Sequence, residues 1–556
     1  MKSLRYFARR LANRLPVAVD AWRLVRAPRS EAMLWNDFAL TMREWKFVRE
    51  LPPPTTGRTA MLALFRDDVF DAKMYALVAV VLRLQGVGVV LKLPSRRATR
   101  AHRLFSSLRL GRVIFDDEVS LTAHDEERID SSVKELTRLK GFDAWSKAEF
   151  DGHQVGPLIL STVIRETENG HPADDDEGFF ARVRGRTRAA LQAYCRSRIV
   201  LDALHPEVVV VQEPGYDTNG PLVDVAVERG TRCIHVATSW RNDALLLKAL
   251  SSGRRRVMPQ TVERETLAAV LESWSPSQEQ SVDDAFTERY GGTWSLQATF
   301  QAPGAISDVD IRKTLGVSEG RRIAVIFSHV IWDATFWAGE DLYRDYAEWF
   351  LAAVRSAISN PSVHWVIKTH PANAYRHDAG DVADRCAEER LIRENFGPLP
   401  DHVTVLPPDT KVSALALYRG ADIGLTVRGS PGFEMACFGK PVLTAGTGAY
   451  VGLGFTIDSV DVGSYERRLA SVQDLRPIPE DWQRRARAYA LALFRWRPWR
   501  LSSFSMEFKV GSPRRALDRN IRPRIQHINE LSAANDLRLA GEWMTRSRET
   551  DYVERP

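Results

Sequence analysis

The stretch Val363–Ala372, with the sequence VHWVIKTHPA, carries the strongest fold signal in the chain. Its first five residues are a short apolar run rich in β-branched side chains, which predicts a buried strand at Val363–Ile367. Lys368, His370 and Pro371 follow directly, where the carboxyl end of that strand is expected. Ligands of open α/β sheets bind just outside the carboxyl ends of the strands, so a cation and an imidazole here favour an anion such as a nucleotide phosphate. A strand cap with a solvated lysine and a surface histidine is an equally good interpretation of this stretch taken alone.

Strand-like and helical segments alternate on both sides of this stretch. The first half of the chain has expected strands at Thr59–Phe65, Val87–Leu91, Val113–Phe115, Glu207–Val211 and Arg232–Val236. The second half has them at Arg322–Phe327, Val363–Ile367, His402–Leu406, Asp422–Thr426 and Pro441–Thr444. Such alternation predicts parallel sheets covered on both faces. We therefore predict an α/β protein with two tandem Rossmann-like domains and a central cleft, together with N-terminal and C-terminal helices.

The length of 556 residues also indicates more than one domain, since a domain usually holds about 100–200 residues. We predict a basic helical segment and linker over 1–56 and a first Rossmann-like domain over 57–300. A second Rossmann-like domain is expected over 301–478. The C-terminal helices, 479–556, are expected to return to the first domain.

Composition excludes several classes of protein. Hydrophobic residues make up 44% and charged residues 27%, which is typical of a globular chain. There is no run of about 18 apolar residues, no GxGxxG after a strand, no P-loop and no GxSxG. The cysteines are far apart and lack CxxC spacing, so we expect reduced thiols and no metal site: Cys195, Cys233, Cys386 and Cys437. The net charge of +6 fits anionic partners, although no nucleic-acid motif stands out, and we expect neither a cofactor nor a nucleic-acid partner.

The segment Met1–Arg29 is rich in arginine and lysine, with apolar residues at helical spacing. It lacks the apolar core and the small-residue cleavage site of a secretory signal. A basic amphipathic helix on an anionic membrane surface is one interpretation. A helix packed on the body of the protein, with a solvated basic face, is the other.

A second strand end precedes the sequence RGSPG at residues 428–432. The proline suits a first helical position and Ser430 suits an N-cap, so a helix is expected to begin here. Exposed backbone N–H groups at such a helix start would favour an anion, and Arg428 would add a bidentate contact to phosphate. Glu434 would accept hydrogen bonds from ribose hydroxyls, and Thr447 lies in a second Gly-rich loop at a strand end. An ordinary strand–cap–helix junction remains the alternative.

Further strand ends offer candidates for proton transfer. His329 follows the expected strand at Arg322–Phe327, where it would contact phosphate, transfer a proton or simply cap the strand. Glu213, Asp67 and Asp68 follow expected strands of the first domain, where a carboxylate would deprotonate an acceptor hydroxyl. For each acid alone, a helix N-cap or a solvated side chain is the better interpretation.

These motifs together resemble the bacterial capsule polysaccharide synthesis proteins, which include capsular Kdo-transferase-like enzymes using CMP-activated acidic sugars. The resemblance is carried by Lys368-Thr369-His370-Pro371, Arg428-Gly429-Ser430-Pro431-Gly432-Phe433-Glu434 and Gly439-Lys440-Pro441-Val442, and is clearest over Arg322–Leu475. It implies the two-domain glycosyltransferase fold called GT-B. It also implies donor binding by His370 and Pro371 and by the loop ending in Ser430 and Glu434. This chain has Ser-Pro-Gly where a Ser-(Thr/Ser)-x-Gly loop is expected, so the donor stays open.

The leading interpretation is a metal-independent glycosyltransferase, cytoplasmic or peripheral on the inner membrane. It would transfer a sugar from a nucleotide-activated donor, with a CMP-linked acidic sugar as one candidate, to a growing capsular or surface polysaccharide. The partners implied are the nucleotide-sugar, a glycan or lipid-linked glycan acceptor and, as one alternative for the amino terminus, an anionic membrane surface. The donor-binding candidates are Lys368, His370, Pro371, Arg428, Gly429, Ser430, Glu434 and Thr447, and the catalytic candidates are Glu213, Asp67, Asp68 and His329. A teichoic-acid-type glycerol- or ribitol-phosphate transferase and a non-catalytic partner in polysaccharide assembly or export are the alternatives.

Overall fold

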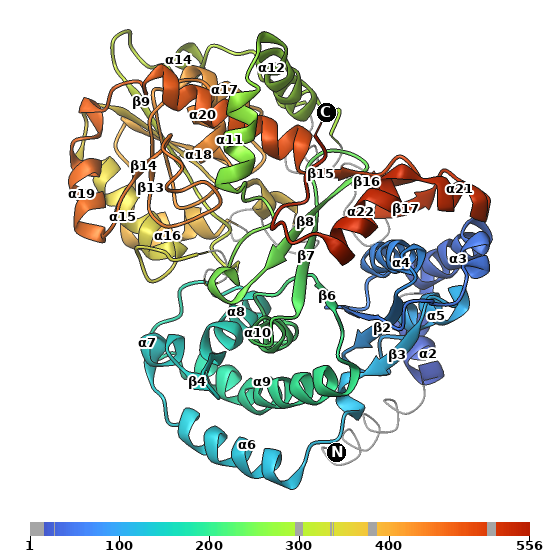
Figure 1. The fold of residues 1–556 in the computed structure, drawn as a ribbon. Helices are drawn as coiled ribbons and strands as arrows, with labels where there is room; N and C mark the ends of the chain where they lie inside the picture. The colour runs from blue at the N-terminus through green and yellow to red at the C-terminus, as the bar shows by residue number, and fades with distance from the viewer. Residues whose placement is uncertain are drawn as a thin grey trace. The chain divides into compact units, whose positions relative to one another are not determined.

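The computed structural model describes residues 16–26, 28–294, 304–333, 336, 339–375, 386–508 and 519–555. Residues 1–15 of the predicted basic segment therefore lie outside the described residues. The chain divides into two compact units, shown in Figure 1, which we describe one at a time. Unit 1 comprises Met1–Leu160, Phe180–Arg255 and Trp499–Tyr552, and unit 2 comprises Ser161–Phe179, Arg256–Pro498 and Val553–Pro556. The cleft predicted between two domains stays a prediction.

Unit 1 is built on a seven-stranded sheet of order β15-β8-β7-β6-β1-β2-β3. Its strands are β1 (Thr59–Ala63), β2 (Gly88–Leu93), β3 (Arg112–Phe115), β6 (Val208–Val211), β7 (Arg232–Thr238), β8 (Ala244–Leu250) and β15 (Pro498–Arg500). Neighbouring strands from β7 to β3 pair in parallel, whereas β8 runs antiparallel to β7. The central strands β1 and β6 are buried because apolar side chains lie on both of their faces, as expected for a parallel sheet.

The helices of unit 1 cover this sheet and extend beyond it. They are α2 (Pro16–Arg26), α3 (Pro28–Glu44), α4 (Val69–Leu84), α5 (Thr99–Leu108), α6 (Ala123–Leu136), α7 (Gly141–Ser146), α8 (Val155–Thr167), α9 (Glu177–Leu204), α10 (Gly220–Glu228), α21 (Ile528–Ala533) and α22 (Asn535–Arg546), of which α8 and α9 each extend from unit 1 into the 161–179 segment of unit 2. Single-turn helices are η1 (Lys46–Glu50), η2 (Asp116–Glu118) and η3 (Ser252–Arg254), and a small hairpin joins β4 (Glu149–Phe150) to β5 (His153–Gln154). Helix α4 is buried over nearly its whole length, which places it at the core of the unit.

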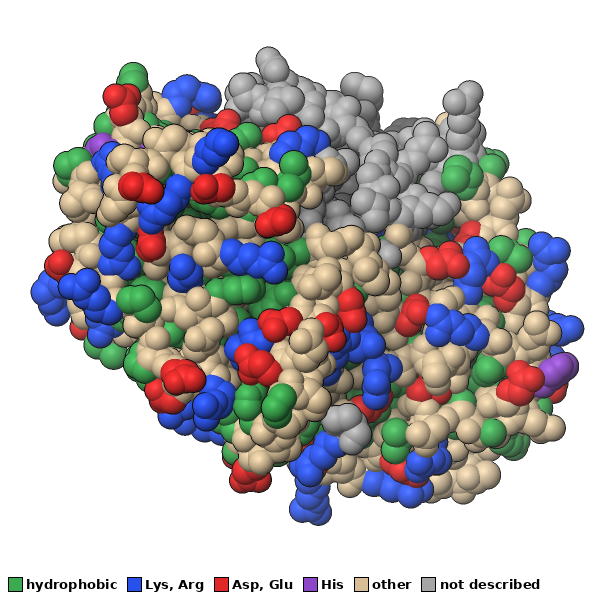
Figure 2. Space-filling model, turned by 90° about the horizontal axis from the view of Figure 1, so that it is seen from above, with side chains coloured by type: hydrophobic (Ala, Val, Ile, Leu, Met, Phe, Trp, Pro, Cys, Tyr) green, Lys and Arg blue, Asp and Glu red, His purple; other side chains and the backbone are tan. Residues whose placement is uncertain are grey.

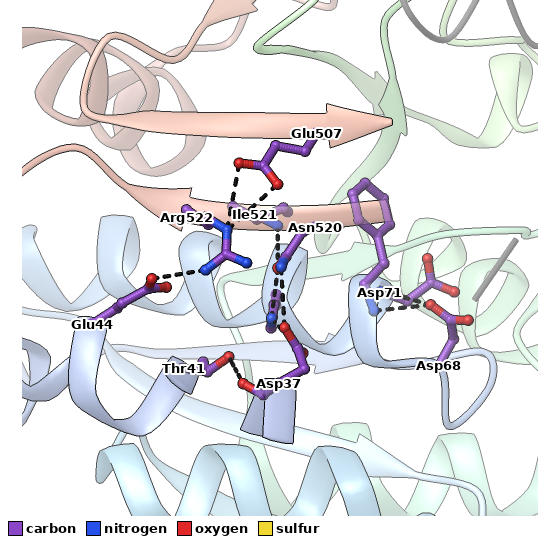
Figure 3. Close-up of polar contacts among 11 residues, drawn as sticks. Asp37, Thr41, Glu44, Asp68, Asp71, Glu507, Asn520, Ile521 and Arg522 are labelled. Atoms are coloured by element: carbon purple, nitrogen blue, oxygen red, sulfur yellow. Dashed lines mark hydrogen bonds and ion pairs between the residues drawn. The ribbon is translucent and has the colours of Figure 1, made fainter. Parts of the chain in front are cut away.

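The carboxyl-terminal region of unit 1 contains strands as well as the predicted helices. The antiparallel pair β16 (Phe504–Phe508) and β17 (Arg519–Pro523) packs beside α3 and α4 (Figure 3). The buried ammonium of Lys73 donates to Asp37 at 2.7 Å and to Asn520 at 2.6 Å, and Arg522 pairs with Glu44 at 2.7 Å. These polar contacts tie the end of the chain to its first helices.

Unit 2 is built on a six-stranded sheet of order β11-β10-β9-β12-β13-β14, in which every neighbouring pair is parallel. Its strands are β9 (Ile323–Phe327), β10 (His364–Lys368), β11 (Val403–Leu406), β12 (Ile423–Thr426), β13 (Val442–Thr444) and β14 (Ile457–Asp458). The predicted strands of this half therefore form one sheet, with β9 in the middle.

Helices of unit 2 form two groups beside the sheet (Figure 1). One group contains α15 (Tyr346–Ser359), α16 (Ala387–Asn395) and α19 (Val462–Ala470); the other contains α11 (Arg264–Glu272), α12 (Pro276–Tyr290), α14 (Ile311–Thr314), α17 (Ala414–Gly420), α18 (Pro431–Ala436) and α20 (Glu480–Leu491). Shorter turns are η4 (Pro371–Tyr375), η6 (Val472–Asp474) and the π-helical η7 (Ala492–Trp496). Trp349, Phe350 and Val354 of α15 pack into the core against the strands. The α/β class with two Rossmann-like units is thus confirmed.

The units differ from the predicted domain boundaries in two places. Apart from the segment Ser161–Phe179, unit 2 begins at Arg256 rather than near 301, since α11 and α12 pack against α20 within it. Helix α20 itself belongs to unit 2, so only the segment Trp499–Tyr552 returns to unit 1. Contacts between helices that precede and follow the strands of unit 2 decide these boundaries, and such contacts are not visible in strand periodicity.

Candidate functional site

Three polar loops follow the three neighbouring central strands of unit 2. Strand β10 lies beside β9 and β9 beside β12, all parallel, so their carboxyl ends meet at one edge of the sheet. The loops begin at Ser328, Thr369 and Val427. This topology brings the predicted residues His329 and His370 to the same edge, where the charge of one histidine affects the pKa of the other.

The ring of His329 is held by the loop that follows β12. Its Nε2 accepts the backbone N–H of Val427 at 3.2 Å and that of Arg428 at 3.3 Å, and lies 3.0 Å from Oγ1 of Thr426. A ring nitrogen that accepts N–H groups carries no proton, so the proton of the neutral ring is on Nδ1. The ring also stacks on Tyr346, with centroids 4.5 Å apart. Burial, with a smaller effect of Arg428, holds the pKa of His329 well below its usual value, so the ring is neutral at pH 7.

The ring of His370 is held through its other nitrogen, Nδ1, and therefore has the opposite tautomer. Its Nδ1 accepts the backbone N–H of Ala372 at 3.1 Å, which places the proton of the neutral ring on Nε2. Burial, together with the nearby charge of Lys368, lowers the pKa of His370 to about 4. Within the described ranges, neither the Nε2–H of His370 nor the Nδ1–H of His329 has a hydrogen-bond partner. Each ring therefore presents one neutral N–H donor that the fold itself does not use.

A carboxylate that sequence analysis missed joins the first two loops. Glu388, at the start of α16, is fully buried and accepts hydrogen bonds from Oγ of Ser328 at 2.6 Å and from the backbone N–H of His370 at 3.0 Å. A third bond, 2.7 Å long, comes from the side chain of Asn373. Glu388 lies 18 residues after His370, without an adjacent strand, so strand-end reasoning could not find it. An acid in the first turn of an amphipathic helix was its only signal.

Lys368 lies at the end of β10 but is not an open contact. It is 9% exposed, and its ammonium donates to the backbone carbonyl of Thr369 at 2.7 Å. Burial lowers the pKa of Lys368 to about 8, and the nearby carboxylate of Glu388 opposes that shift. The ammonium is thus mostly protonated at pH 7, and its positive charge lies behind His370.

The guanidinium of Arg428, predicted to grip phosphate, is committed inside the protein. It forms an ion pair with Asp341, a residue that sequence analysis did not assign, and lies over the ring of Tyr346 at 5.8 Å. The side chain is 3% exposed, and burial lowers its pKa to about 10. Arg428 therefore supplies a fixed positive charge beside His329 rather than an extended arm.

The second Gly-rich loop has a packing role. A side chain at Gly446 would lie 2.9 Å from Oδ1 of Asp341, and one at Gly448 would lie 2.7 Å from Cβ of Arg428. The backbone N–H of Thr447 donates to the carbonyl of Glu340 at 2.7 Å. Glycine is required because this loop lies directly on the Arg428–Asp341 pair, which accounts for the motif without a ligand.

The loop before α18 differs from the predicted anion cradle. Ser430 is at the N-cap position, but its side chain makes no capping hydrogen bond, and α18 has only six residues. The N–H of Gly429 donates to Oγ1 of Thr426 at 3.1 Å, and that of Gly432 to the carbonyl of Gly429 at 3.0 Å. Since the amides of residues 427 and 428 hold His329, four amides of this loop, those of residues 427, 428, 429 and 432, are engaged within the protein.

The carboxylate of Glu434 is engaged by residues of a neighbouring helix. It is fully buried and pairs with Arg289 at 2.9 Å, while Tyr290 also donates to it. A carboxylate one turn into α18 thus fastens that helix to α12. The ribose contact predicted for Glu434 is replaced by this structural ion pair.

Two of the predicted acids of unit 1 are helix caps. Asp67 accepts the backbone N–H of Ala101 at 3.0 Å, at the start of α5, and pairs with Arg23 at 3.1 Å. Asp68 caps α4, accepting the N–H of Phe70 at 2.9 Å. The alternative interpretation of these acids is therefore the one that the geometry favours.

Glu213 is different, because it follows β6 in a strained backbone conformation. Its φ of 48° lies in the left-handed region, which costs a residue other than glycine roughly 1–3 kcal/mol. The pKa of the nearby Arg66 is raised overall. Burial lowers it, the carboxylate of Asp71 raises it, and Asp68 and Glu213 add smaller upward effects. Of the three predicted acids, Glu213 therefore has the strained backbone conformation, which the surrounding structure must stabilise.

Three broader features concern the surface charge, metal binding and membrane crossing. On the face shown in Figure 2, basic and acidic side chains are interspersed rather than gathered into one basic patch. Within the described ranges, no group of three or more His, Cys, Asp or Glu side chains is arranged to hold a metal ion. In the same part of the chain, no helix combines the length and apolarity needed to cross a membrane.

Comparison with known proteins gives only distant similarities. No protein-family model matches the chain, and no curated protein matches it. Among solved structures, a KpsC β-Kdo 2,7-transferase of Thermosulfurimonas dismutans is 15% identical with a TM-score of 0.30, over 59% of this chain and 85% of that chain. A UDP-GlcNAc 2-epimerase of Neisseria meningitidis bound to UDP-GlcNAc is 13% identical with a TM-score of 0.24, over 78% and 95%. Anabaena HepE in complex with UDP is 11% identical with a TM-score of 0.27, over 79% and 95%. At these TM-scores the similarities carry no weight for function, which we argue from the residues of this chain.

Proposed function

We propose that unit 2 binds the phosphate of a nucleotide-activated sugar and that the chain transfers this sugar to a growing capsular or surface polysaccharide. The observation that carries the proposal is the pair of neutral imidazoles at the carboxyl ends of β9 and β10. Each is fixed on one ring nitrogen by backbone amides and keeps an unused N–H on the other. Two donors fixed at one strand edge suit the oxygens of a phosphate.

The surroundings of these donors suit the departure of a charged leaving group. The charges of Lys368 and Arg428 lie near enough to the two rings to lower their pKa values, and they favour negative charge at the site. Because both charges are already buried and fixed, little reorganisation is needed when the sugar–phosphate bond breaks. We propose that these groups stabilise the leaving phosphate without a metal ion.

Glu213 is the acid that we propose as the base for the acceptor hydroxyl. The support is its strained backbone conformation at a strand end. Glu213→Gln keeps the shape and removes the basic oxygen. We expect a loss of transfer of at least about 100-fold, with nucleotide binding unchanged. Asp68→Asn, which preserves a cap, serves as the control.

The resemblance to capsule proteins supports a CMP-linked acidic sugar as the first donor to test, and a cytoplasmic location. Trp22 and Val25 of α2 are 58% and 83% exposed, which supports the alternative of contact with an anionic membrane. Binding to vesicles containing phosphatidylglycerol, but not to vesicles of phosphatidylcholine alone, is expected, with loss in Trp22→Ser. Binding to neither kind of vesicle would argue for the packed-helix interpretation.

A thermal-shift panel of CMP, UDP, GDP and CDP tests the proposed function. A nucleotide at about 100 times its Kd stabilises the protein by ~2.7 kcal/mol, which raises the Tm by several degrees. We expect one nucleotide to do so in the wild type and in His124→Ala, whose histidine is exposed on α6, but not in His370→Ala. CDP-glycerol, a CMP-sugar and a UDP-sugar are added to the panel, and stabilisation by CDP-glycerol alone among these three would favour the teichoic-acid-type reaction instead. If no nucleotide shifts the wild type, the non-catalytic alternative is favoured.

A further inference from the structure

A surface cavity lies at the start of two helices of unit 2, away from the strand ends described above. It has a volume of about 430 Å³ and is formed where the first turns of α12 and α20 meet the end of α11. Figure 1 shows these three helices together, and they pack against one another. The volume lies within the ~300–1,000 Å³ of small-molecule sites.

The cavity is at the opposite edge of the sheet from the two histidines. Helix α18 begins just after the carboxyl end of β12 and ends just before β13 begins. Gln483, which lines the cavity, donates from Nε2 to the carbonyl of Cys437 at 3.0 Å, at the far end of α18. A ligand in the cavity therefore contacts none of the groups proposed to hold the donor.

The walls combine one aromatic ring with unused polar groups. Trp274 is partly exposed, and in the described part of the chain its ring contacts no other ring and its N–H has no partner. Arg484 and Glu480, both exposed, form no ion pair or hydrogen bond with described residues. Gln483 keeps its side-chain oxygen as an acceptor, because only its nitrogen is used.

A buried arginine keeps these walls in place. Arg487 of α20 has a side chain that is 8% exposed, and it pairs with Glu279 and, at 2.8 Å, with Asp283 of α12. It also donates to the backbone carbonyl of Glu279 at 3.0 Å. Because this network joins the two helices, the cavity is preformed and a ligand does not have to order it.

The balance of charge points to an uncharged ligand. Among the charged residues that line the cavity, Glu279 is paired with Arg487, and Arg484 balances Glu480, so the lining has no net charge. The Glu480 carboxylate would repel an anion, and the Arg484 guanidinium would repel a cation. The hydroxyl groups of an uncharged ligand can donate hydrogen bonds to Glu480 and accept them from Arg484. The C–H face of a pyranose ring can lie on the indole of Trp274, which removes apolar surface from water.

We propose that this cavity is a second saccharide-binding site, which holds an uncharged pyranose unit of a glycan on Trp274 between Glu480, Gln483 and Arg484. The site stands independently of the donor site. Only the further idea that its glycan is the polymer being extended rests on the proposed function. In that case the site would keep the chain bound between rounds of transfer.

The test is saturation-transfer NMR on the full chain with four trisaccharide probes. Three probes are uncharged, built of glucose, of galactose or of N-acetylglucosamine, and one contains a uronic acid. We expect at least one uncharged probe to bind with little dependence on salt between 50 and 500 mM NaCl. Trp274→Ala and Glu480→Gln should each weaken that binding at least tenfold, and His370→Ala should leave it unchanged.

Other outcomes would overturn the proposal. These are no binding of any uncharged probe at millimolar concentration, binding of the uronic-acid probe alone, or binding that survives both Trp274→Ala and Glu480→Gln. Both variants change exposed or half-exposed side chains, and their melting temperatures are compared with that of the wild type to verify folding. The two proposals fail separately. Absence of saccharide binding in a protein that binds nucleotide would refute this site alone, whereas absence of nucleotide binding in a protein that binds saccharide would refute the proposed function alone.

Discussion

The carboxyl edges of the two sheets use titratable side chains in opposite ways. In unit 1, Asp67 and Asp68 follow β1, but backbone amides and a guanidinium occupy their oxygens. In unit 2, backbone amides occupy only one nitrogen of His329 and of His370 and leave the other as a donor. A residue at a strand end is thus a candidate for ligand binding only to the extent that the fold leaves part of its hydrogen-bonding capacity unused.

The largest effect is expected at Glu388, on which the arrangement in unit 2 depends. Glu388→Ala leaves the N–H and O–H donors of Ser328, His370 and Asn373 without an acceptor, at ~1–3 kcal/mol each, and also removes the weaker contact with the Cys386 thiol, so we expect a loss of unfolding free energy of about 3–5 kcal/mol. Urea denaturation measures it, with Glu394→Ala on the same helix as the matched control. A loss below about 1 kcal/mol would mean that Glu388 does not hold the two loops together.

The next effect is the dependence of stability on pH caused by His370. Its pKa is about 4 in the folded protein and ~6.5 in the unfolded chain, so the unfolded chain binds more protons between these values. Stability should therefore fall as the pH drops from ~6.5 to ~4, by up to ~1.4 kcal/mol per pH unit. His370→Gln should lose this slope, which unfolding curves at pH 7, 6 and 5 would show. Equal slopes in both proteins would indicate that the ring is not buried in its neutral form.

A smaller change in stability is expected at Asp68 of unit 1, and it tests whether this residue is a helix cap or a catalytic group. Asp68→Ala removes the cap of α4 and should cost about 1 kcal/mol, whereas Asp68→Asn keeps a capping oxygen and should cost only a few tenths. Transfer activity should persist in Asp68→Asn. An inactive Asp68→Asn of normal stability would show that this carboxylate is catalytic and that the contrast between the two edges is wrong.

The smallest effect comes from His171, whose pKa shifts in the direction opposite to that of His370. A hydrogen bond to the buried carboxylate of Asp345, 2.8 Å long, raises the pKa of His171. Its contribution is present below ~6.5 and is lost as the pH rises through the raised value. The difference in Tm between wild type and His171→Ala should therefore be larger at pH 6 than at pH 8.5. The reverse order would rule out the charged hydrogen bond.

Much of the sheet architecture was predictable because parallel strands are apolar on both faces. The apolar sequences that form β9, β10 and β12 are buried along their whole length, as their composition predicts. Strand β8 (ALLLKAL) was not predicted, since Leu and Ala favour helices, and pairing with β7 overrides that preference. The side chain of Lys248 in this strand is buried against Asp551, a partner 303 residues away.

The candidate site was predictable in position more than in detail. Strand order brings His329 and His370 to one edge, as the placement of each after an apolar run predicts. The commitment of Arg428 to Asp341 and of Glu434 to Arg289 was not predictable, because each partner lies in a segment without a motif. Spacing shows which side chains are near an edge, whereas tertiary contacts decide which of them a ligand can reach.

The most direct test of the central claim is NMR of the protein with ¹⁵N-labelled histidine, with and without the nucleotide that stabilises it. At pH 7 we predict neutral rings with opposite tautomers, the proton on Nδ1 in His329 and on Nε2 in His370, assigned with the His329→Gln and His370→Gln variants. Nucleotide should shift these two N–H signals and leave that of His124 unchanged. Protonated rings at pH 7, or nucleotide binding that leaves both signals in place, would contradict the account.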